Sequence, residues 1–246
     1  ISLGLVGSEM CIRDRLIYTT TNLLKEVMKY KVINFLLTIF LSINVVSSEI
    51  PPYSAKYNFE SEEISISGIR EFYKTKNGFE MRFKASNLFA SLFFLSKFEI
   101  KNSEVISDSY EIKIRPKFLD RDQYLNFDYE TLEVRSEGIN QWVASLKDNL
   151  LHDPLNVQIM IRTNVKHGLK NFKINIVDME EGGSKSYEFN VVGLEECIFN
   201  GETLKCVILE RSRLNSNRKV TYYLAEELEH MFIKIIDASP ERTNTC

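Results

Sequence analysis

Hydrophobic and polar side chains alternate along most of this chain with a period of two residues. Phe79, Met81 and Phe83, for example, are separated by Glu80 and Arg82. Such alternation is typical of β-strands that bury one face and expose the other, whereas strands of parallel sheets read as continuous apolar runs. Similar runs occupy residues 110–115, 125–129, 172–176, 187–191 and 231–235. The pattern therefore predicts a mainly β fold of antiparallel strands.

Turn-forming residues separate these runs. Asn77-Gly78 lies between two alternating segments and is a strong signal for a tight hairpin. Glu181–Ser184 contains two adjacent glycines, and Asn200–Thr203 reads as a four-residue hairpin loop. We therefore expect an antiparallel hairpin at each of these three positions.

One segment has the signals of a helix. Asp153 fits the N-cap, Pro154 fits the first helical position, and His167-Gly168 fits the end. The buried stripe of this helix would consist of Leu155, Ile159 and Met160. A strand through Val157–Val165 is the alternative, because that run is also rich in β-branched residues. The helix is favoured.

The segment from Leu88 to Ile100 is apolar on both faces near its middle. We interpret it as a central strand that is covered on both sides, or as one that crosses a fold in the sheet. The alternative is that it forms part of the wall of an apolar pocket.

The N-terminal part of the chain reads as a targeting segment. Residues 28–48 combine a basic start at Lys29 and Lys31, an apolar run over Val32–Val46 and small residues before Glu49, as in a secretory signal peptide. The run is shorter than the roughly 20 residues of a membrane span. We therefore predict cleavage after Ser48, export to the periplasm and no membrane span after cleavage; an uncleaved anchor is the weaker alternative.

Residues 1–27 precede Met28, a plausible initiator. The stretch from Ser2 to Arg15 resembles a translated sequencing adapter, so we treat residues 1–27, including Cys11, as an artefact of the gene model or as untranslated upstream sequence. Residues 49–246 would then form a single β-domain, because no repeat, low-complexity tract or linker divides them.

Composition agrees with a folded domain. The 246 residues are 44% hydrophobic and 26% charged, with a formal net charge of −3. Nucleic-acid binding would require a clustered basic excess, and here lysine and arginine are spread along the chain among acidic residues. We therefore expect no nucleic-acid partner.

Two cysteines flank the predicted loop at Asn200–Thr203. A four-residue loop places Cys197 directly opposite Cys206, within disulfide reach, and an exported compartment is oxidising enough to join them. We predict this disulfide; the alternative is two free buried thiols. Cys246 would be left without a partner.

The sequence has no motif for a catalytic, cofactor or metal site. It lacks a Cys-x-x-Cys pair, a Gly-x-Ser-x-Gly elbow and a phosphate-binding glycine loop. The histidines His152, His167 and His230 are far apart, and we expect each to be an ordinary surface or turn residue. Trp142 is expected in a loop, where it caps the core or lines a pocket mouth. We name no catalytic residue, cofactor or metal ligand.

Several short segments carry a family resemblance. They are Ser67-Gly68-Ile69, the run from Phe83 to Phe93, Asp153-Pro154-Leu155, the run from Tyr187 to Glu195 with Gly201, and Tyr223-Leu224-Ala225 with Ile233–Ile235. In this order they resemble domain of unknown function 3108, a family of exported bacterial proteins, over about Tyr53 to Ile236. Departures are His152 in place of glutamine, Tyr223 in place of tryptophan, and no proline near Met231. The resemblance implies a curved antiparallel sheet, or a partial or closed β-barrel, with one short helix, and carries over no catalytic residues.

Two functions fit these features. A curved sheet with a helix across its open side would enclose an apolar concavity, so we expect a non-catalytic module that binds a lipid or another apolar or amphiphilic small ligand. The alternative is an envelope interaction or assembly protein whose sheet edge or helix docks on a protein partner. An enzyme is the least favoured reading, because no motif supports one.

Overall fold

The computed structural model describes residues 50–60, 65–88, 90–115, 121–146, 150–213, 218–238 and 243–245. All of them belong to one compact unit, Ser48–Cys246. The predicted signal peptide at 28–48, the segment 1–27 and Cys246 lie outside the described residues.

The described chain is built mainly of strands, which form one continuous hydrogen-bonded sheet. Their order in the sheet is β8-β7-β6-β5-β4-β3-β2-β1-β15-β14-β13-β12-β11-β10-β9. The first eight strands are β1 (Tyr53–Glu60), β2 (Ser65–Thr75), β3 (Gly78–Ser86), β4 (Ser91–Lys101), β5 (Glu104–Arg115), β6 (Gln123–Asp128), β7 (Glu133–Gly138) and β8 (Trp142–Ser145). The others are β9 (Leu151–His152), β10 (Asn171–Val177), β11 (Ser184–Phe199), β12 (Glu202–Ser212), β13 (Lys219–Ala225), β14 (Met231–Ala238) and β15 (Thr243–Thr245).

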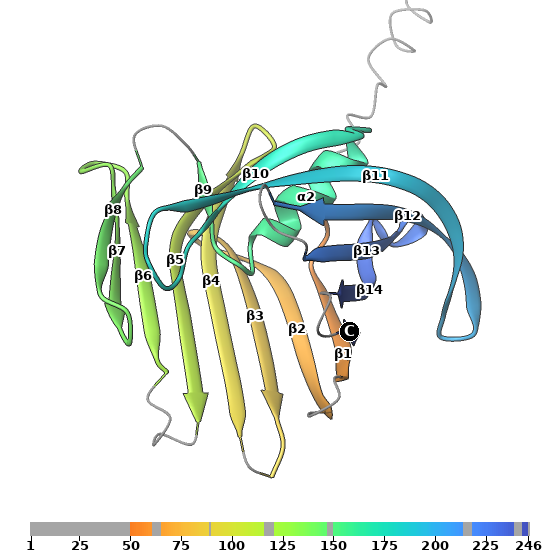
Figure 1. Ribbon diagram of the computed structural model, residues 1–246, viewed down its shortest axis with the longest axis horizontal. Coiled ribbons are helices and arrows are strands. Elements are labelled where there is room, and N and C mark those ends of the chain that lie inside the picture. The colour runs from red at the N-terminus through yellow and green to blue at the C-terminus, as the bar shows by residue number, and fades with distance from the viewer. Residues whose placement is uncertain are drawn as a thin grey trace, which may run out of the picture. The chain divides into compact units, whose positions relative to one another are not determined.

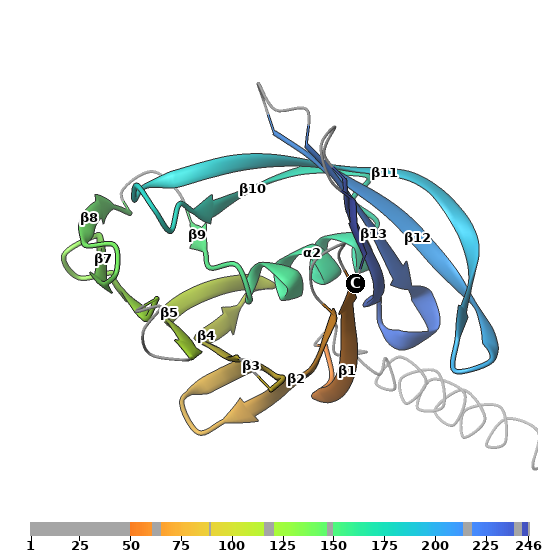
Figure 2. The same cartoon turned by 60° about the horizontal axis from the view of Figure 1, so that its bottom comes forward.

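The sheet bends into two layers that enclose a helix. Strands β1–β8 form one layer, and β10–β14 curve across it, with helix α2 (Val157–Lys166) between the two (Figure 1). A second view shows β10 and β11 arching over α2 from the side opposite β1–β5 (Figure 2). Neighbouring strands pair antiparallel except β9 and β10, which are parallel. The predicted fold class is therefore confirmed: a curved, antiparallel partial barrel with one α-helix among the described residues.

Helix α2 is buried because it is apolar on more than one side. Ile159, together with Leu155 of the preceding turn, packs in the core of the β1–β8 layer, whereas Val157 and Ile161 pack in the core of the β10–β14 layer. Met160 contacts both cores. A helix that is apolar on several sides is stable only in the interior, so these positions explain why the two layers close around α2.

The helix prediction is confirmed, with a later start than expected. Regular helix begins at Val157, after a turn over residues 154–156. Asp153 Oδ1 accepts hydrogen bonds from the backbone N–H groups of Leu155 (2.7 Å) and Asn156 (2.8 Å), so this carboxylate organises the turn ahead of the helix. The helix ends as predicted, at His167 and Gly168, whose φ is +77°.

The three predicted hairpins form, and the first two differ in detail. In the first, Thr75 pairs with Gly78, so the loop is Lys76-Asn77, and Gly78, expected in the turn, begins β3. The expected four-residue loop at 200–203 is wrong, because Phe199 pairs with Glu202 and the loop is only Asn200-Gly201. Both loop residues have positive φ, 53° and 83°, the conformation that two-residue hairpins require and that Asn-Gly adopts readily. The third turn joins β10 to β11.

The apolar segment at 88–100 forms β4, which lies between β3 and β5 in the middle of the first layer. The central position is as predicted, but the strand is not fully covered. The side chains of Leu92, Phe93, Phe94 and Leu95 are each only half-buried, and Leu88, which precedes the strand, is 96% exposed. Side chains on both faces of this part of β4 are therefore only partly covered.

Candidate functional site

On the inner face of the β1–β5 layer, the burial of the side chains decreases from one end of the strands to the other. At one end Phe72, Phe79 and Phe98 are fully packed, with ring centroids 5.5–6.1 Å apart. At the other end the inward side chains are only partly buried against the same core; they include Phe59, Ile66, Leu92, Phe94 and Ile112. We call this second set the open apolar face.

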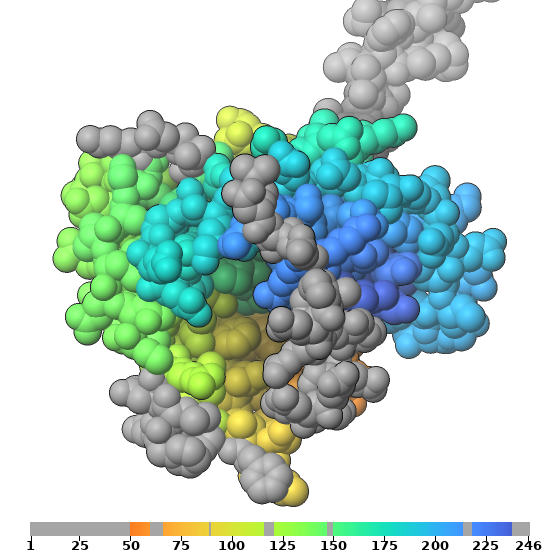
Figure 3. All heavy atoms as spheres, in the orientation of Figure 1, coloured from red at the N-terminus to blue at the C-terminus, as the bar shows by residue number. Residues whose placement is uncertain are grey.

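A recess in the surface exposes this part of the interior. In Figure 3 the yellow of β3 and β4 is visible at its floor, between the green of β5 and β6 and the teal turn that joins β10 to β11. Apolar side chains in a concavity that water can enter are a common basis for binding apolar ligands.

One charged residue lies in the row where the packed core meets the open apolar face. Arg70 of β2 pairs with Phe83 of β3, Phe83 pairs with Phe94 of β4, and Phe94 pairs with Ile112 of β5. Paired residues of neighbouring strands share one face of a sheet. Arg70 therefore points into the interior beside the aromatic side chains of the open apolar face.

The guanidinium of Arg70 is buried and incompletely paired. Only 4% of the residue is exposed, and its central carbon lies 4.2 Å from the ring centroid of Tyr57 and 5.9 Å from that of Phe83. Both Nε and Nη1 are buried without a hydrogen-bond partner. Among the described residues, no carboxylate lies within ion-pair distance of Arg70.

Gly68 provides the space that the Phe83 ring occupies next to Arg70. A Cβ atom at Gly68 would lie 2.4 Å from two ring atoms of Phe83. The Phe83 ring in turn contacts Phe59 and Phe94, with centroids 5.3 and 5.8 Å away. The absence of a side chain at Gly68 thus lets the Phe83 ring lie beside the arginine and continue into the open apolar face.

Arg162 on α2 is equally buried but differently paired. It is 2% exposed, and its Nε and Nη2 donate to the backbone carbonyl of Glu229, at 3.1 and 2.9 Å. Its guanidinium also lies 5.0 Å from the Tyr53 ring, and only Nη1 lacks a partner. Arg162 therefore fixes the helix to the turn before β14 and serves a structural role.

A second hollow of about 320 Å³ lies between α2 and the β10–β14 layer. Its walls are mostly apolar, with polar groups such as Gln158, Arg211 and Asp237 among the lining residues. Arg211 stacks on the ring of Tyr187 at 4.8 Å, and Gln158 Oε1 is buried without a partner. This hollow could accept a small apolar group.

A polar network fixes the turn before α2 to the first layer. Ser96 Oγ donates to Asp153 Oδ2 at 2.6 Å, and Asn156 Nδ2 donates to Ser107 Oγ at 2.9 Å. Burial raises the pKa of Asp153 to about 7 and lowers the pKa of its neighbour His152 to about 4. The expectation of a surface His152 is wrong, because β9 packs beside β5 inside the barrel, where Ser107 Oγ donates to the Leu151 carbonyl.

The other histidines and Trp142 occupy turn and strand positions. His167 is exposed at the end of α2 and His230 lies half-buried in the turn before β14. Trp142 begins β8 and is not in a loop; its Nε1 donates to the Met179 carbonyl at 3.3 Å, which also accepts from Gln123 and Asn140. These bonds fasten the β10–β11 turn to the first layer at the edge of the recess.

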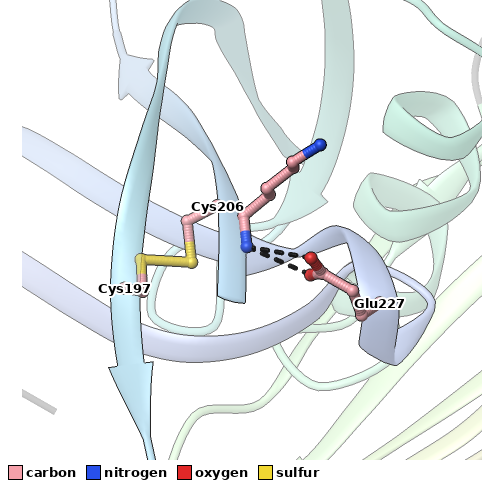
Figure 4. Close-up of a disulfide and its surroundings, with 4 residues drawn as sticks. Cys197, Cys206 and Glu227 are labelled. Atoms are coloured by element: carbon pink, nitrogen blue, oxygen red, sulfur yellow. Dashed lines mark hydrogen bonds between the residues drawn. A yellow bond between two sulfur atoms is a disulfide. The ribbon is translucent and has the colours of Figure 1, made fainter. Parts of the chain in front are cut away.

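The two cysteines that were paired from the sequence are joined by a disulfide in the structure (Figure 4). Because the loop has only two residues, Cys197 pairs with Leu204, and Cys206 pairs with Glu195. The cysteines are thus diagonal neighbours on one face, with Cα atoms 5.9 Å apart. Their cluster is separate from the core that carries the open apolar face, so the disulfide stabilises the β11–β12 hairpin and is not part of the recess.

Arg70 was not among the residues predicted from the sequence, although the pattern contains a signal. Arg70 is two residues from both Gly68 and Phe72, so all three point to the same face of β2. An arginine at an inward position between a glycine and a buried phenylalanine marks a buried charge. Its lack of a partner follows only from the packing of β1 and β3 around it.

The described residues contain no group of three or more His, Cys, Asp or Glu side chains that could hold a metal ion. In the same part of the chain, no helix has the length and apolar character needed to cross a membrane.

Comparisons with known proteins support the fold alone. No family model matches the sequence, and no curated protein matches it. A crystal structure of a "Beta-barrel-like Protein of Domain of Unknown Function DUF1849" from Brucella abortus aligns with a TM-score of 0.56 and 7% identity, over 80% of this chain and 95% of that chain. The chain thus shares a β-barrel-like fold with a protein of unknown function, which belongs to a different family from the one that the sequence resembles.

Proposed function

We infer that this protein is an exported, non-catalytic module that binds an apolar or amphiphilic ligand in the interior of its partial barrel. The open apolar face carries this proposal: Phe59, Phe94 and Leu92 point inward yet stay only partly buried. Folding normally covers aromatic side chains that point into an interior. An interior that leaves them accessible at a recess is suited to an apolar guest.

Export to the periplasm by way of the segment at 28–48 is part of this proposal and rests on the sequence pattern. Membership of domain of unknown function 3108 also remains a proposal, which rests on the short segments named above. A barrel interior would shield a lipid-like ligand from water during passage through an aqueous compartment, because apolar surface is costly to expose.

A fluorescence titration with N-phenyl-1-naphthylamine, a neutral fluorophore whose emission increases in apolar surroundings, tests the proposal. Phe94→Gln places a polar side chain on the open apolar face and should weaken binding. Phe93→Gln is the matched control, because Phe93 is the next residue of β4, is also half-buried, and points to the outer face beside Lys113. Absence of binding to the wild type, or equal loss in both variants, would contradict the proposal.

Docking on a protein partner remains the second candidate, and one observation favours it. The β11–β12 hairpin exposes Leu194 (68%) and Ile198 (82%), and a shallow hollow of about 530 Å³ beside it is lined by Val192 and Leu169 among others. Exposed apolar side chains that gather on one element are typical of interaction surfaces. Leu194→Ser with Ile198→Ser should then abolish association with the partner while leaving binding of the fluorophore unchanged.

A further inference from the structure

Arg70 holds a permanent charge in a place where the described part of the chain supplies no counter-charge. A guanidinium does not lose its proton at physiological pH, and buried charges in proteins are normally paired. Arg70 is 4% exposed, and its Nε and Nη1 have no hydrogen-bond partner. The contrast with Arg162 is informative, because that side chain is just as buried and uses the Glu229 carbonyl twice.

The aromatic contacts of Arg70 engage its positive charge but provide no acceptor for its N–H groups. Tyr57 and Phe83 offer ring faces at 4.2 and 5.9 Å from the guanidinium carbon, and a cation–π contact engages the charge through the ring face. The N–H groups lie in the plane of the guanidinium and match the paired oxygens of a carboxylate or phosphate. Two of the donor atoms, Nε and Nη1, lie on different edges of the guanidinium and have no hydrogen-bond partner, so each edge keeps a donor for such a ligand.

The surroundings of Arg70 define the rest of the ligand. The row that contains Arg70 continues through Phe83 to Phe94 and Ile112, and the adjacent rows toward the open end carry Leu92 and Phe59. A chain of methylene groups laid along these side chains would place its end beside the guanidinium. An inorganic anion alone would leave this apolar surface unused.

We propose that Arg70 anchors the oxyanion head group of a single-chain amphiphile whose tail lies on the open apolar face. This proposal rests on the proposed function and narrows it, because it requires a carboxylate or phosphate at the head of the ligand. The head-group oxygens accept from the guanidinium of Arg70, and Tyr57 and Phe83 hold the guanidinium in place.

Isothermal titration calorimetry with laurate, dodecyl phosphate and dodecanol tests the anchor. The three ligands share one alkyl chain and differ in head group, so the two anions separate a carboxylate from a phosphate preference. Wild-type protein should bind at least one anion about tenfold or more tightly than dodecanol, as expected for charge-assisted hydrogen bonds. Arg70→Met should lose that preference and keep its affinity for dodecanol.

Lys84→Met is the matched control, because it also removes one positive charge, from the exposed outer face of the neighbouring strand β3. It should keep the preference for the anion. Arg70→Gln, which keeps N–H donors without the charge, provides a second test should Arg70→Met fail to fold, and it should behave like Arg70→Met.

The outcomes separate the two proposals. Equal binding of all three ligands by the wild type would overturn the anchor and leave the proposed function standing. A preference that survives in the Arg70 variants, or that is lost equally in Lys84→Met, would also overturn the anchor. Failure of the wild type to bind dodecanol and both anions would overturn the proposed function together with it.

Discussion

The guanidinium of Arg70 lies over the ring of Tyr57, and the Tyr57 hydroxyl donates to the Phe232 carbonyl at 2.9 Å. Tyr57 belongs to β1 and Phe232 to β14, so one side chain joins the buried arginine of the first layer to the second layer. The position of the cation in the interior therefore depends on the contact between the layers.

Removing only the hydroxyl should separate these two roles of Tyr57. Tyr57→Phe loses the bond to the Phe232 carbonyl and keeps the ring beneath Arg70, so the free energy of unfolding should fall by about 1 kcal/mol. Tyr57→Leu also loses the aromatic face and should cost about 1 kcal/mol more. Urea denaturation measures both, and an equal loss in the two variants would show that the ring contributes nothing to holding Arg70.

The two buried arginines should respond oppositely to replacement by an apolar residue. Arg70→Met removes an unpaired buried charge, so stability should stay the same or rise by about 1–2 kcal/mol. Arg162→Met leaves the Glu229 carbonyl without its donors and should cost about 2–4 kcal/mol. A clear destabilisation by Arg70→Met would show that the protein itself satisfies this charge.

Asp153 should make the protein less stable as pH rises. Its pKa is about 7 in the folded protein and 3.8 ordinarily, so the folded state holds the proton more tightly. The resulting stabilisation is complete below pH 3.8 and is lost as pH rises through about 7. The free energy of unfolding of Asp153→Asn, measured relative to that of the wild type, should therefore rise by on the order of 3–4 kcal/mol from pH 4 to pH 8. Exposed Asp108 is the control: Asp108→Asn should show no such trend in a denaturation series.

His152 should act with the opposite sign over a similar pH range. Its pKa is about 4 when folded and 6.5 ordinarily, so its contribution is present above pH 6.5 and lost as pH falls through about 4. His152→Gln should therefore lose less stability on acidification than the wild type, whereas His167→Gln, at the exposed end of α2, should follow the wild type. Identical pH dependence of all three proteins would show that His152 is not buried.

The disulfide should matter for stability and not for ligand binding. The loop between Cys197 and Cys206 is short, with a sequence separation of 9, so replacing both by serine should cost roughly 2–3 kcal/mol. Affinity for the fluorophore should not change, because the bond lies in a cluster apart from the open apolar face. A loss of binding in a variant that remains folded would place the hairpin in the site.

The sequence predicted what local patterns determine. Alternation identified strands such as β3, and the signals at Asp153 and Gly168 located the one α-helix of the described residues. Local sequence patterns did not determine the length of the loop at Asn200-Gly201, because a shift of register between β11 and β12 leaves the composition of the turn unchanged. They also could not predict the burial of His152 or the lack of an ion-pair partner for Arg70 among the described residues, since both depend on contacts between strands distant in sequence.

Native mass spectrometry of the protein purified from a bacterial cell envelope shows whether the barrel holds an amphiphile. We expect a species heavier than the chain by the mass of one amphiphile, retained in Phe93→Gln and lost in Phe94→Gln. Extraction of the wild type with organic solvent should release that molecule and return the chain to its own mass. A wild-type spectrum that shows only the unliganded chain, or an adduct that Phe94→Gln retains in full, would contradict the account.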